Sequence, residues 1–246
     1  MVSATFRFHD ELNDFLAPFR RGHEFTVPCA EAATTKHMIE ALGVPHTEVA
    51  RILVNGEPAG FDRLLREGDR VTVHPRAGAM DAPLLHGHAT RDPRFVADAH
   101  LGGLARMLRM LGFDTLYDNH AHDDAIVEIC ERDGRIVLTR DRELLKRRAV
   151  ARGCYVHALK SEDQLREIVE RLDLARSARP FTRCLHCNVP LRPVDKASVL
   201  DRLPPRVREH YAHFSTCDAC GRVYWEGSHW RNMRRMLDGL LNNEDT

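Results

Sequence analysis

Four cysteines in two Cys-x-x-Cys pairs are the strongest chemical signal in this sequence of 246 residues. The pairs are "RCLHCN", with Cys184 and Cys187, and "TCDACG", with Cys217 and Cys220. Two such pairs are typical of a tetrahedral zinc site built from thiolates. Unliganded thiols and a redox pair are the alternatives, but neither pair opens a helix after a thioredoxin-like strand. We therefore predict a structural zinc ion bound by these four cysteines.

Aspartates that follow apolar runs form a second set of reactive residues. Asp98 follows "FVA", Asp118 follows "TLY" and Asp141 follows "IVLTR", while Asp123 and Asp124 stand at the start of a helical stretch. Carboxylates held close together raise one another's pKa, so several in one place usually need a cation. Mg²⁺ and Mn²⁺ prefer such oxygen ligands. The sequence therefore predicts a divalent metal site.

Each of these acids also has a structural alternative. Capping of the following helix explains Asp123 or Asp124 equally well, because aspartate is a common N-cap residue. Capping can also explain Asp98 and Asp141, although both end strongly apolar runs. Asp163 lies in "SEDQ", which matches a capping box, so we assign it a structural role.

A parallel sheet is the element that can bring the aspartates together. From residue 94 to residue 174, short apolar runs alternate with helical stretches such as "LGGLARMLRMLG" and "DDAIVEICERDG". This alternation predicts βαβ units and an α/β fold. The carboxyl ends of parallel strands meet at one edge of the sheet, where ligands bind. We expect the acidic site at that edge.

The first 78 residues predict a different order: strand, strand, helix, strand, strand. "SATFRF", "HEFTVP", "ARILVNGEP" and "DRVTVHPRAG" have the pattern of strands, and "TTKHMIEALG" that of a helix. This order resembles the ubiquitin-like β-grasp domains of the sulfur-carrier type. Those carriers end in a free Gly-Gly, whereas "PRAGAM" continues into more protein, so we expect a docking role. Residues 79–93, rich in Gly, Ala, Pro and His, are expected to form a linker.

The composition of the chain argues against a membrane-spanning or secreted protein and limits how it can bind nucleic acid. Hydrophobic residues make up 43% and charged residues 29% of the chain, and no apolar run approaches the roughly 20 residues that span a bilayer. Charges near the amino terminus argue against a signal peptide, so we expect a cytoplasmic protein without a membrane partner. The formal net charge is zero, so any nucleic-acid binding must come from local basic patches. We expect Cys29, Cys130 and Cys154 to be small buried side chains.

Residues 94–240 resemble the Mut-seven C-terminal RNase (Mut7-C) family, a branch of the PIN-like nucleases joined to a zinc ribbon. The resemblance rests on "FVADAHLGGLARMLRMLGFDT", "GRIVLTRDRELL", "RCLHCNVPL" and "FSTCDACGRVYWEGSHW". It implies a PIN-like parallel sheet flanked by helices over residues 94–176 and a zinc ribbon with a carboxy-terminal helix over residues 177–246. A ubiquitin-like domain ahead of this unit also occurs in that family. The sequence departs from the family at Gly103, where members usually carry a basic residue.

The resemblance implies metal-dependent hydrolysis of RNA phosphodiester bonds, with transfer RNA as one candidate target. Asp98, Asp123 and Asp141 would be catalytic and would bind Mg²⁺ or Mn²⁺, with Asp124 as a further catalytic candidate. The basic residues around this edge that we expect to contact RNA are Arg106, Arg109, Arg140, Arg142 and Lys146, and Arg147 and Arg148 lie nearby.

Two other function classes remain open from the sequence. The chain could be an RNA-binding module that does not cleave, or a partner-docking regulatory protein dominated by its amino-terminal domain. Two copies could also form a homodimer. In "YWEGSHWRNMRRM", Tyr224, Trp225 and Trp230 lie next to basic residues, so they could stack on bases or pack against the zinc knuckle.

Overall fold

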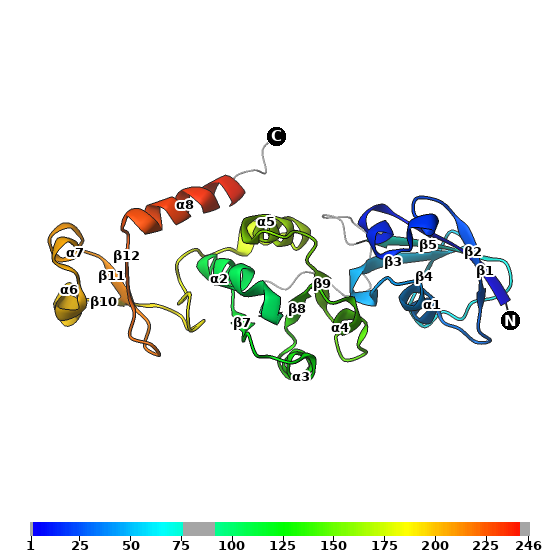
Figure 1. Ribbon diagram of the computed structural model, residues 1–246, viewed down its shortest axis with the longest axis horizontal. Coiled ribbons are helices and arrows are strands. Elements are labelled where there is room, and N and C mark those ends of the chain that lie inside the picture. The colour runs from blue at the N-terminus through cyan, green and yellow to red at the C-terminus, as the bar shows by residue number, and fades with distance from the viewer. Residues whose placement is uncertain (1, 76–91, 242–246) are drawn as a thin grey trace.

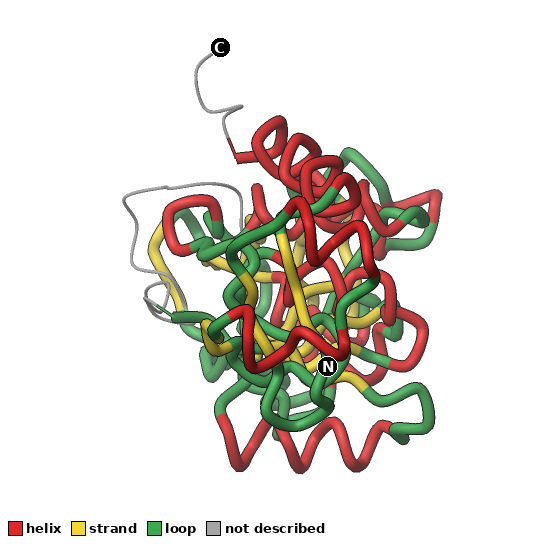
Figure 2. Tube along the Cα trace, turned by 90° about the vertical axis from the view of Figure 1, so that its left-hand side faces the viewer, coloured by secondary structure: helices red, strands yellow, loops and turns green. Residues whose placement is uncertain are grey.

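The computed structural model describes residues 2–75 and 92–241, which form three parts in a row (Figure 1). An amino-terminal sheet lies at one end of the long axis, a parallel sheet in the centre and a cysteine-containing ribbon at the other end. Viewed along this axis, the parts lie one behind another (Figure 2). Most of the predicted linker, residues 79–91, lies outside the described residues. None of the helices within the described ranges has the length and apolar character needed to cross a membrane.

The amino-terminal part is a five-stranded mixed sheet with strand order β2-β1-β5-β3-β4. Its elements are β1 (Val2–Phe8), η1 (Asp10–Phe15), η2 (Pro18–Arg20), β2 (Phe25–Cys29), α1 (Thr35–Ala41), η3 (His46–Glu48), β3 (Val49–Val54), β4 (Glu57–Ala59) and β5 (Asp69–Pro75). β1 pairs parallel with β5 and antiparallel with β2, which gives a β-grasp sheet. The predicted element order is confirmed. The short β4 is additional and follows a turn at Asn55 and Gly56, both with positive φ.

The central part is a four-stranded parallel sheet with strand order β7-β6-β8-β9, and its α/β fold confirms the prediction. Its elements are β6 (Phe95–Ala97), η4 (Ala99–Leu101), α2 (Gly102–Met110), β7 (Thr115–Tyr117), α3 (Asp123–Asp133), β8 (Ile136–Thr139), α4 (Arg142–Lys146), β9 (Gly153–Tyr155) and α5 (Ser161–Arg171). Successive strand residues face opposite sides. Phe95 and Leu138 pack in the core with α2 and α5, whereas Val96 and Val137 pack with α3.

The ribbon, residues 182–225, follows the short η5 (Ala175–Ser177) and contains three antiparallel strands: β10 (Arg192–Val194), β11 (Phe214–Thr216) and β12 (Val223–Trp225). Between the cysteine pairs, the structure has three short helices: α6 (Lys196–Val199), η6 (Leu200–Arg202) and α7 (Pro205–His210). One continuous helix does not form, because two successive prolines, Pro204 and Pro205, interrupt it. The last helix, α8 (Ser228–Leu241), buries Leu237 in the core that also contains α2 and α5.

The three cysteines outside the ribbon lie where the sequence predicted. Cys29 is buried in the amino-terminal sheet, and Cys130 and Cys154 are buried on either side of the parallel sheet. They therefore contribute to packing, as small apolar side chains do.

Candidate active site

Asp98 and Asp141 lie at the carboxyl edge of the parallel sheet. Asp98 directly follows β6, and Asp141 stands two residues after the end of β8. The chain passes from β6 to β7 on one side and then to β8 on the other, so β6 and β8 flank the topological switch point. Ligands of open α/β sheets bind in the crevice outside this point. The alternating pattern of the sequence thus correctly predicted that both aspartates follow strands at this edge of the sheet.

Thr139, the last residue of β8, links the two aspartates. Its hydroxyl donates a hydrogen bond of 2.6 Å to Oδ2 of Asp98 and accepts one of 2.9 Å from the backbone N–H of Asp141. Thr139 is fully buried and Asp98 is only 9% exposed, with its Oδ1 bound to the N–H of Ala99. We did not select Thr139 from the sequence. Its position two residues before Asp141 is the feature of the sequence that could have indicated it.

Asp141 caps α4, so the capping alternative is realised at this position. Its Oδ1 accepts hydrogen bonds from the N–H groups of Glu143, at 2.7 Å, and Leu144, at 3.4 Å. Its second oxygen, Oδ2, makes no hydrogen bond to the part of the chain that the structure describes. Capping fixes the carboxylate and leaves one oxygen free for a ligand.

Asp123 and Asp124 lie in the first turn of α3, but neither caps it, because His122 occupies the N-cap position. Both form ion pairs with Arg147, with a distance of 3.5 Å between Asp123 Oδ2 and Nη2. The hydrogen bond that Arg147 donates to Asp124 raises the pKa of Arg147, and the charges of Asp123 and Asp141 act in the same direction. Arg147 is therefore the counter-ion of Asp123 and Asp124.

The acids do not form a closed metal site. Across residues 2–75 and 92–241, the one group of three or more His, Cys, Asp or Glu side chains placed to share an ion is the set of four cysteines. The expectation that Asp98, Asp123 and Asp141 form a compact cluster is therefore not confirmed. Asp98 is turned toward Thr139, Asp141 toward the amides of α4, and Asp123 toward Arg147.

Arg109, expected to contact RNA, is instead buried and binds the protein backbone. Only 7% of it is exposed. Its Nε donates to the carbonyl of Thr115 at 2.9 Å, and its Nη1 donates to the carbonyls of Leu185 and His186 at 3.2 and 2.9 Å. This side chain fastens the first cysteine pair to the sheet, and its guanidinium is directed mainly at backbone carbonyls of the protein.

Three further residues expected to bind RNA are engaged within the chain. Arg140 donates to the carbonyls of His157 and Ala158, Arg142 to that of Phe15, and Lys146 to the carboxylate of Glu143. Arg106 differs, because it is exposed and has no polar partner within the described ranges. Of the five basic residues, Arg106 is thus the one left open to a ligand.

The packing around Gly103 explains why this position carries glycine instead of the basic residue that is usual in the family. A Cβ added there would lie 2.1 Å from Oγ and 3.0 Å from Cβ of Ser161, the first residue of α5. The glycine thus allows α2 and α5 to approach closely. A basic side chain at this position would require Ser161 to move.

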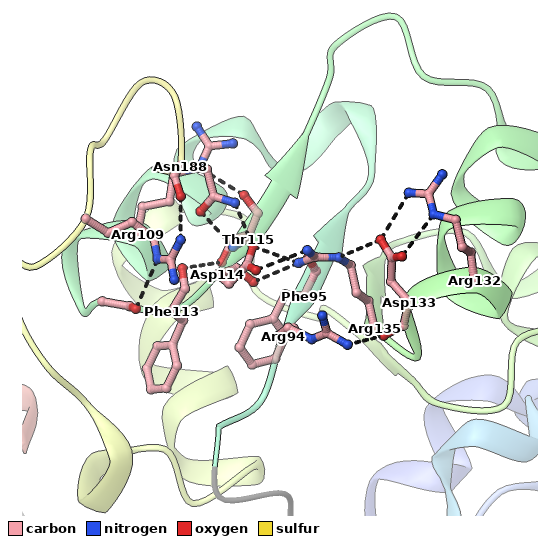
Figure 3. Close-up of polar contacts among 12 residues, drawn as sticks. Arg94, Phe95, Arg109, Phe113, Asp114, Thr115, Arg132, Asp133, Arg135 and Asn188 are labelled. Atoms are coloured by element: carbon pink, nitrogen blue, oxygen red, sulfur yellow. Dashed lines mark hydrogen bonds and ion pairs between the residues drawn. The ribbon is translucent and has the colours of Figure 1, made fainter. Parts of the chain in front are cut away.

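A second polar network, which sequence reasoning missed, lies at the opposite edge of the sheet (Figure 3). Asp114 accepts hydrogen bonds from Arg135, at 2.8 and 3.1 Å, and from Asn188, at 2.7 Å. Asn188 also accepts a bond from the N–H of Thr115. Burial would raise the pKa of Asp114, but the bonds from Arg135 and Asn188 hold it below its ordinary value. The residue that could have indicated this network in the sequence is Asn188, which directly follows Cys187. In the structure, Asn188 adopts a positive φ.

The four cysteines are placed to hold a metal ion, and their geometry fits zinc. All four sulfur atoms lie within 4.8 Å of one another. Zn–S bonds of about 2.3 Å in a tetrahedron put sulfur atoms about 3.8 Å apart, and the Cys184 and Cys220 sulfurs are separated by 3.8 Å. Burial alone would raise the pKa of Cys184, but hydrogen bonds from the Tyr224 hydroxyl and from backbone amides lower it. A stabilised thiolate is the form that binds zinc.

Comparison with known families places this geometry in context. Residues 93–237, more than half of the chain, match the family described as the Mut7-C RNAse domain. The chain belongs to the Mut7-C RNAse family. Residues 1–81 match the Mut7-C ubiquitin family, so the amino-terminal sheet is a ubiquitin-like domain. Membership of this family indicates a ribonuclease-type function.

Two solved structures of small archaeal modifier protein 1 (SAMP1) from Haloferax volcanii are also similar to the chain. Both are 17% identical to it. They cover 30% and 32% of this chain and 98% and 99% of their own, with TM-scores of 0.25 and 0.26. No curated protein matches the chain.

Proposed function

We propose that this Mut7-C protein is a ribonuclease that depends on Mg²⁺ or Mn²⁺ and hydrolyses RNA at the edge formed by Asp98, Asp123 and Asp141. The observation that carries the proposal is the link through buried Thr139, which holds Asp98 and Asp141 together at the switch point. Capping alone does not require a buried hydroxyl shared between two acids. Family membership supports the reaction class.

The acids offer ligand atoms of the type that these ions prefer. Asp141 Oδ2 is free within the described residues, and Asp123 keeps Oδ1 outside its ion pair with Arg147. Hard divalent ions bind such oxygens and retain several waters, so they do not need a fully closed protein cage. A bound ion would lower the pKa of a water ligand and neutralise charge on the scissile phosphate.

The protein's own residues supply positioning and charge. Asp98 is held on both oxygens, so it is a rigid acceptor at the floor of the site. The Arg147 side chain is 39% exposed and is bound to the acids. When an ion neutralises those acids, its guanidinium becomes available to a phosphate oxygen. Transfer RNA remains one candidate among the substrates.

Cleavage by three matched variants tests the proposal. Asp98→Asn and Asp141→Asn each keep the shape of the side chain and remove one charge. We expect each to lower the cleavage rate by about a hundredfold or more, because an organising ligand is lost. Asp163→Asn is the control, since Asp163 is 52% exposed on α5 and pairs with Arg166. Total RNA and transfer RNA are incubated with Mg²⁺ or Mn²⁺, and new ends are mapped.

Equal zinc content and melting temperature of the variants must be established first. If both site variants then cleave as fast as the Asp163→Asn protein, this edge is not the nuclease site. If wild type binds RNA but never cuts it, the protein is a non-cleaving RNA-binding module.

A further inference from the structure

A large groove lies between the ribbon, α2 and α8, outside the acidic edge. Its volume is about 1050 Å³, above the roughly 300–1,000 Å³ typical of small-molecule pockets. Its walls include Arg106 of α2, Lys196 of α6, Trp225 of β12 and Trp230 of α8. Helix α2 thus builds one concavity together with the ribbon and α8, which lie far from it in the sequence.

The charge of the groove is positive although the chain as a whole is neutral. Five lysine or arginine side chains line it against two carboxylates. Arg183, Arg222 and Arg234 are engaged with groups of the protein. Arg106 and Lys196 have no polar partner among the described residues, so their charges are available to a ligand. A local excess of this kind attracts a polyanion.

Both tryptophans of the chain line the same groove. Trp230 packs against Phe181 with ring centroids 4.8 Å apart, and Trp225 ends β12 with its side chain partly exposed. A polyphosphate or an acidic peptide would need cations but no flat aromatic surfaces. Unpaired bases stack on aromatic side chains, whereas bases in a duplex are already stacked on each other.

Helix α2 lies between the groove and the proposed cleavage edge in the chain, because it follows Asp98 closely and contributes Arg106 to the groove. The helix begins at Gly102, four residues after Asp98, and Arg106 stands one turn further, about 6 Å along the helix axis. An RNA strand that reached from the groove to Asp98 would run along α2. We propose that the groove binds single-stranded RNA, with Arg106 and Lys196 on phosphates and the two tryptophans stacking on bases. This inference rests on the proposed function and extends it to the substrate's form.

Tryptophan fluorescence provides a direct measurement, because no tryptophan lies outside the groove. The full chain carrying Asp141→Asn is titrated with a 12-nucleotide oligouridylate, with zinc retained and no added Mg²⁺. We expect saturable quenching as bases stack. Arg106→Glu combined with Lys196→Glu should weaken binding roughly tenfold or more and reduce the slope of log affinity against log salt by about 0.7 for each lost phosphate contact.

Arg7→Glu combined with Arg176→Glu is the matched control, since both arginines are exposed and neither lines the groove. It makes the same change in net charge and should leave affinity within about twofold. The inference is overturned if the oligonucleotide causes no quenching, if the control pair weakens binding as much as the groove pair, or if inorganic polyphosphate binds equally well with equal quenching.

Gel analysis of the same samples separates this inference from the proposed function. If Asp141→Asn still shortens the oligonucleotide, the assignment of the cleavage edge fails while the quenching result stands. If the oligonucleotide stays intact and quenching is absent, the groove inference fails and the cleavage edge is unaffected.

Discussion

At the scale of single residues, a fully buried threonine links the two aspartates of the candidate site. Thr139 donates to Asp98 and accepts from the amide of Asp141, so it sets the position of one carboxylate and of the loop that carries the other. Because this hydroxyl is fully buried, water cannot replace it as a partner. Removing it leaves a buried carboxylate oxygen without its donor.

Thr139→Val should therefore impair both stability and cleavage, while Thr139→Ser should restore much of each. Valine matches threonine in shape but lacks the hydroxyl, so we expect a loss of about 1–3 kcal/mol in the free energy of unfolding. The two effects are measured by denaturant unfolding and by initial cleavage rates at saturating RNA. A valine variant as active and stable as wild type would remove Thr139 from the site.

Sequence reasoning located the acids but could not sort the basic residues. Strand ends are visible in the sequence as the last apolar residue of a run, which is why Asp98 and Asp141 were found. The partner of an arginine is set by tertiary packing. Arg109 binds carbonyls of the ribbon 76 and 77 residues away, and no local pattern encodes such a contact.

At the scale of elements, the ribbon contains the same turn, or knuckle, at each of its two Cys-x-x-Cys pairs. The N–H of Cys184 donates to the carbonyl of Val189, as that of Cys217 does to Arg222. Asn188 and Gly221 follow the second cysteine of each pair, and both have a positive φ. This geometry is local, so the cysteine spacing predicted it. The return of α8 onto the central core could not be predicted, because Leu237 packs against residues more than a hundred positions earlier.

The ribbon should require one zinc ion per chain in order to fold. The unfolded chain lacks the site, so the free energy of metal binding, about 10–16 kcal/mol in zinc-finger peptides, becomes free energy of folding. We expect Cys217→Ser to lose zinc and the ribbon's structure. Cys29→Ser, which changes a buried cysteine of the amino-terminal sheet, should keep one zinc ion per chain. Elemental analysis and tryptophan emission of protein purified without chelator check both expectations, and wild type without zinc would refute them.

At the scale of the whole molecule, the ubiquitin-like domain is docked on the nuclease sheet. Strand β9 is an edge strand, and its outward amide, that of Tyr155, donates a hydrogen bond of 2.6 Å to Glu48 of η3. Glu48 also pairs with Arg171 of α5. An uncovered edge strand invites association with other chains. The partner-docking role predicted from the sequence stays a prediction, whereas the structure shows contacts between this domain and the parallel sheet of the same chain.

This docking reaches the candidate site through α4. Arg142, the residue after Asp141, donates to the carbonyl of Phe15 and lies 4.9 Å from the centre of its ring. The helix capped by Asp141 is therefore held in part by the ubiquitin-like domain. From the sequence, Arg142 was assigned to RNA, because its partner is 127 residues away in another domain.

Glu48→Gln should destabilise the molecule as a unit and lower its cleavage rate. Glutamine still accepts from Tyr155 but leaves the mostly buried Arg171 without its full counter-charge. Breaking such a pair costs about 3 kcal/mol or more, which lowers the melting temperature of a chain this size by about 6–12 °C. Glu31→Gln, at an exposed position of the same domain, is the control and should melt like wild type. Calorimetry and hydrogen exchange at the Tyr155 amide provide the measurements.

Because Arg142 shares this interface, loosening the interface should also release α4 and slow cleavage. An unchanged melting temperature, or unchanged exchange at Tyr155, would show that the two domains are not coupled through Glu48.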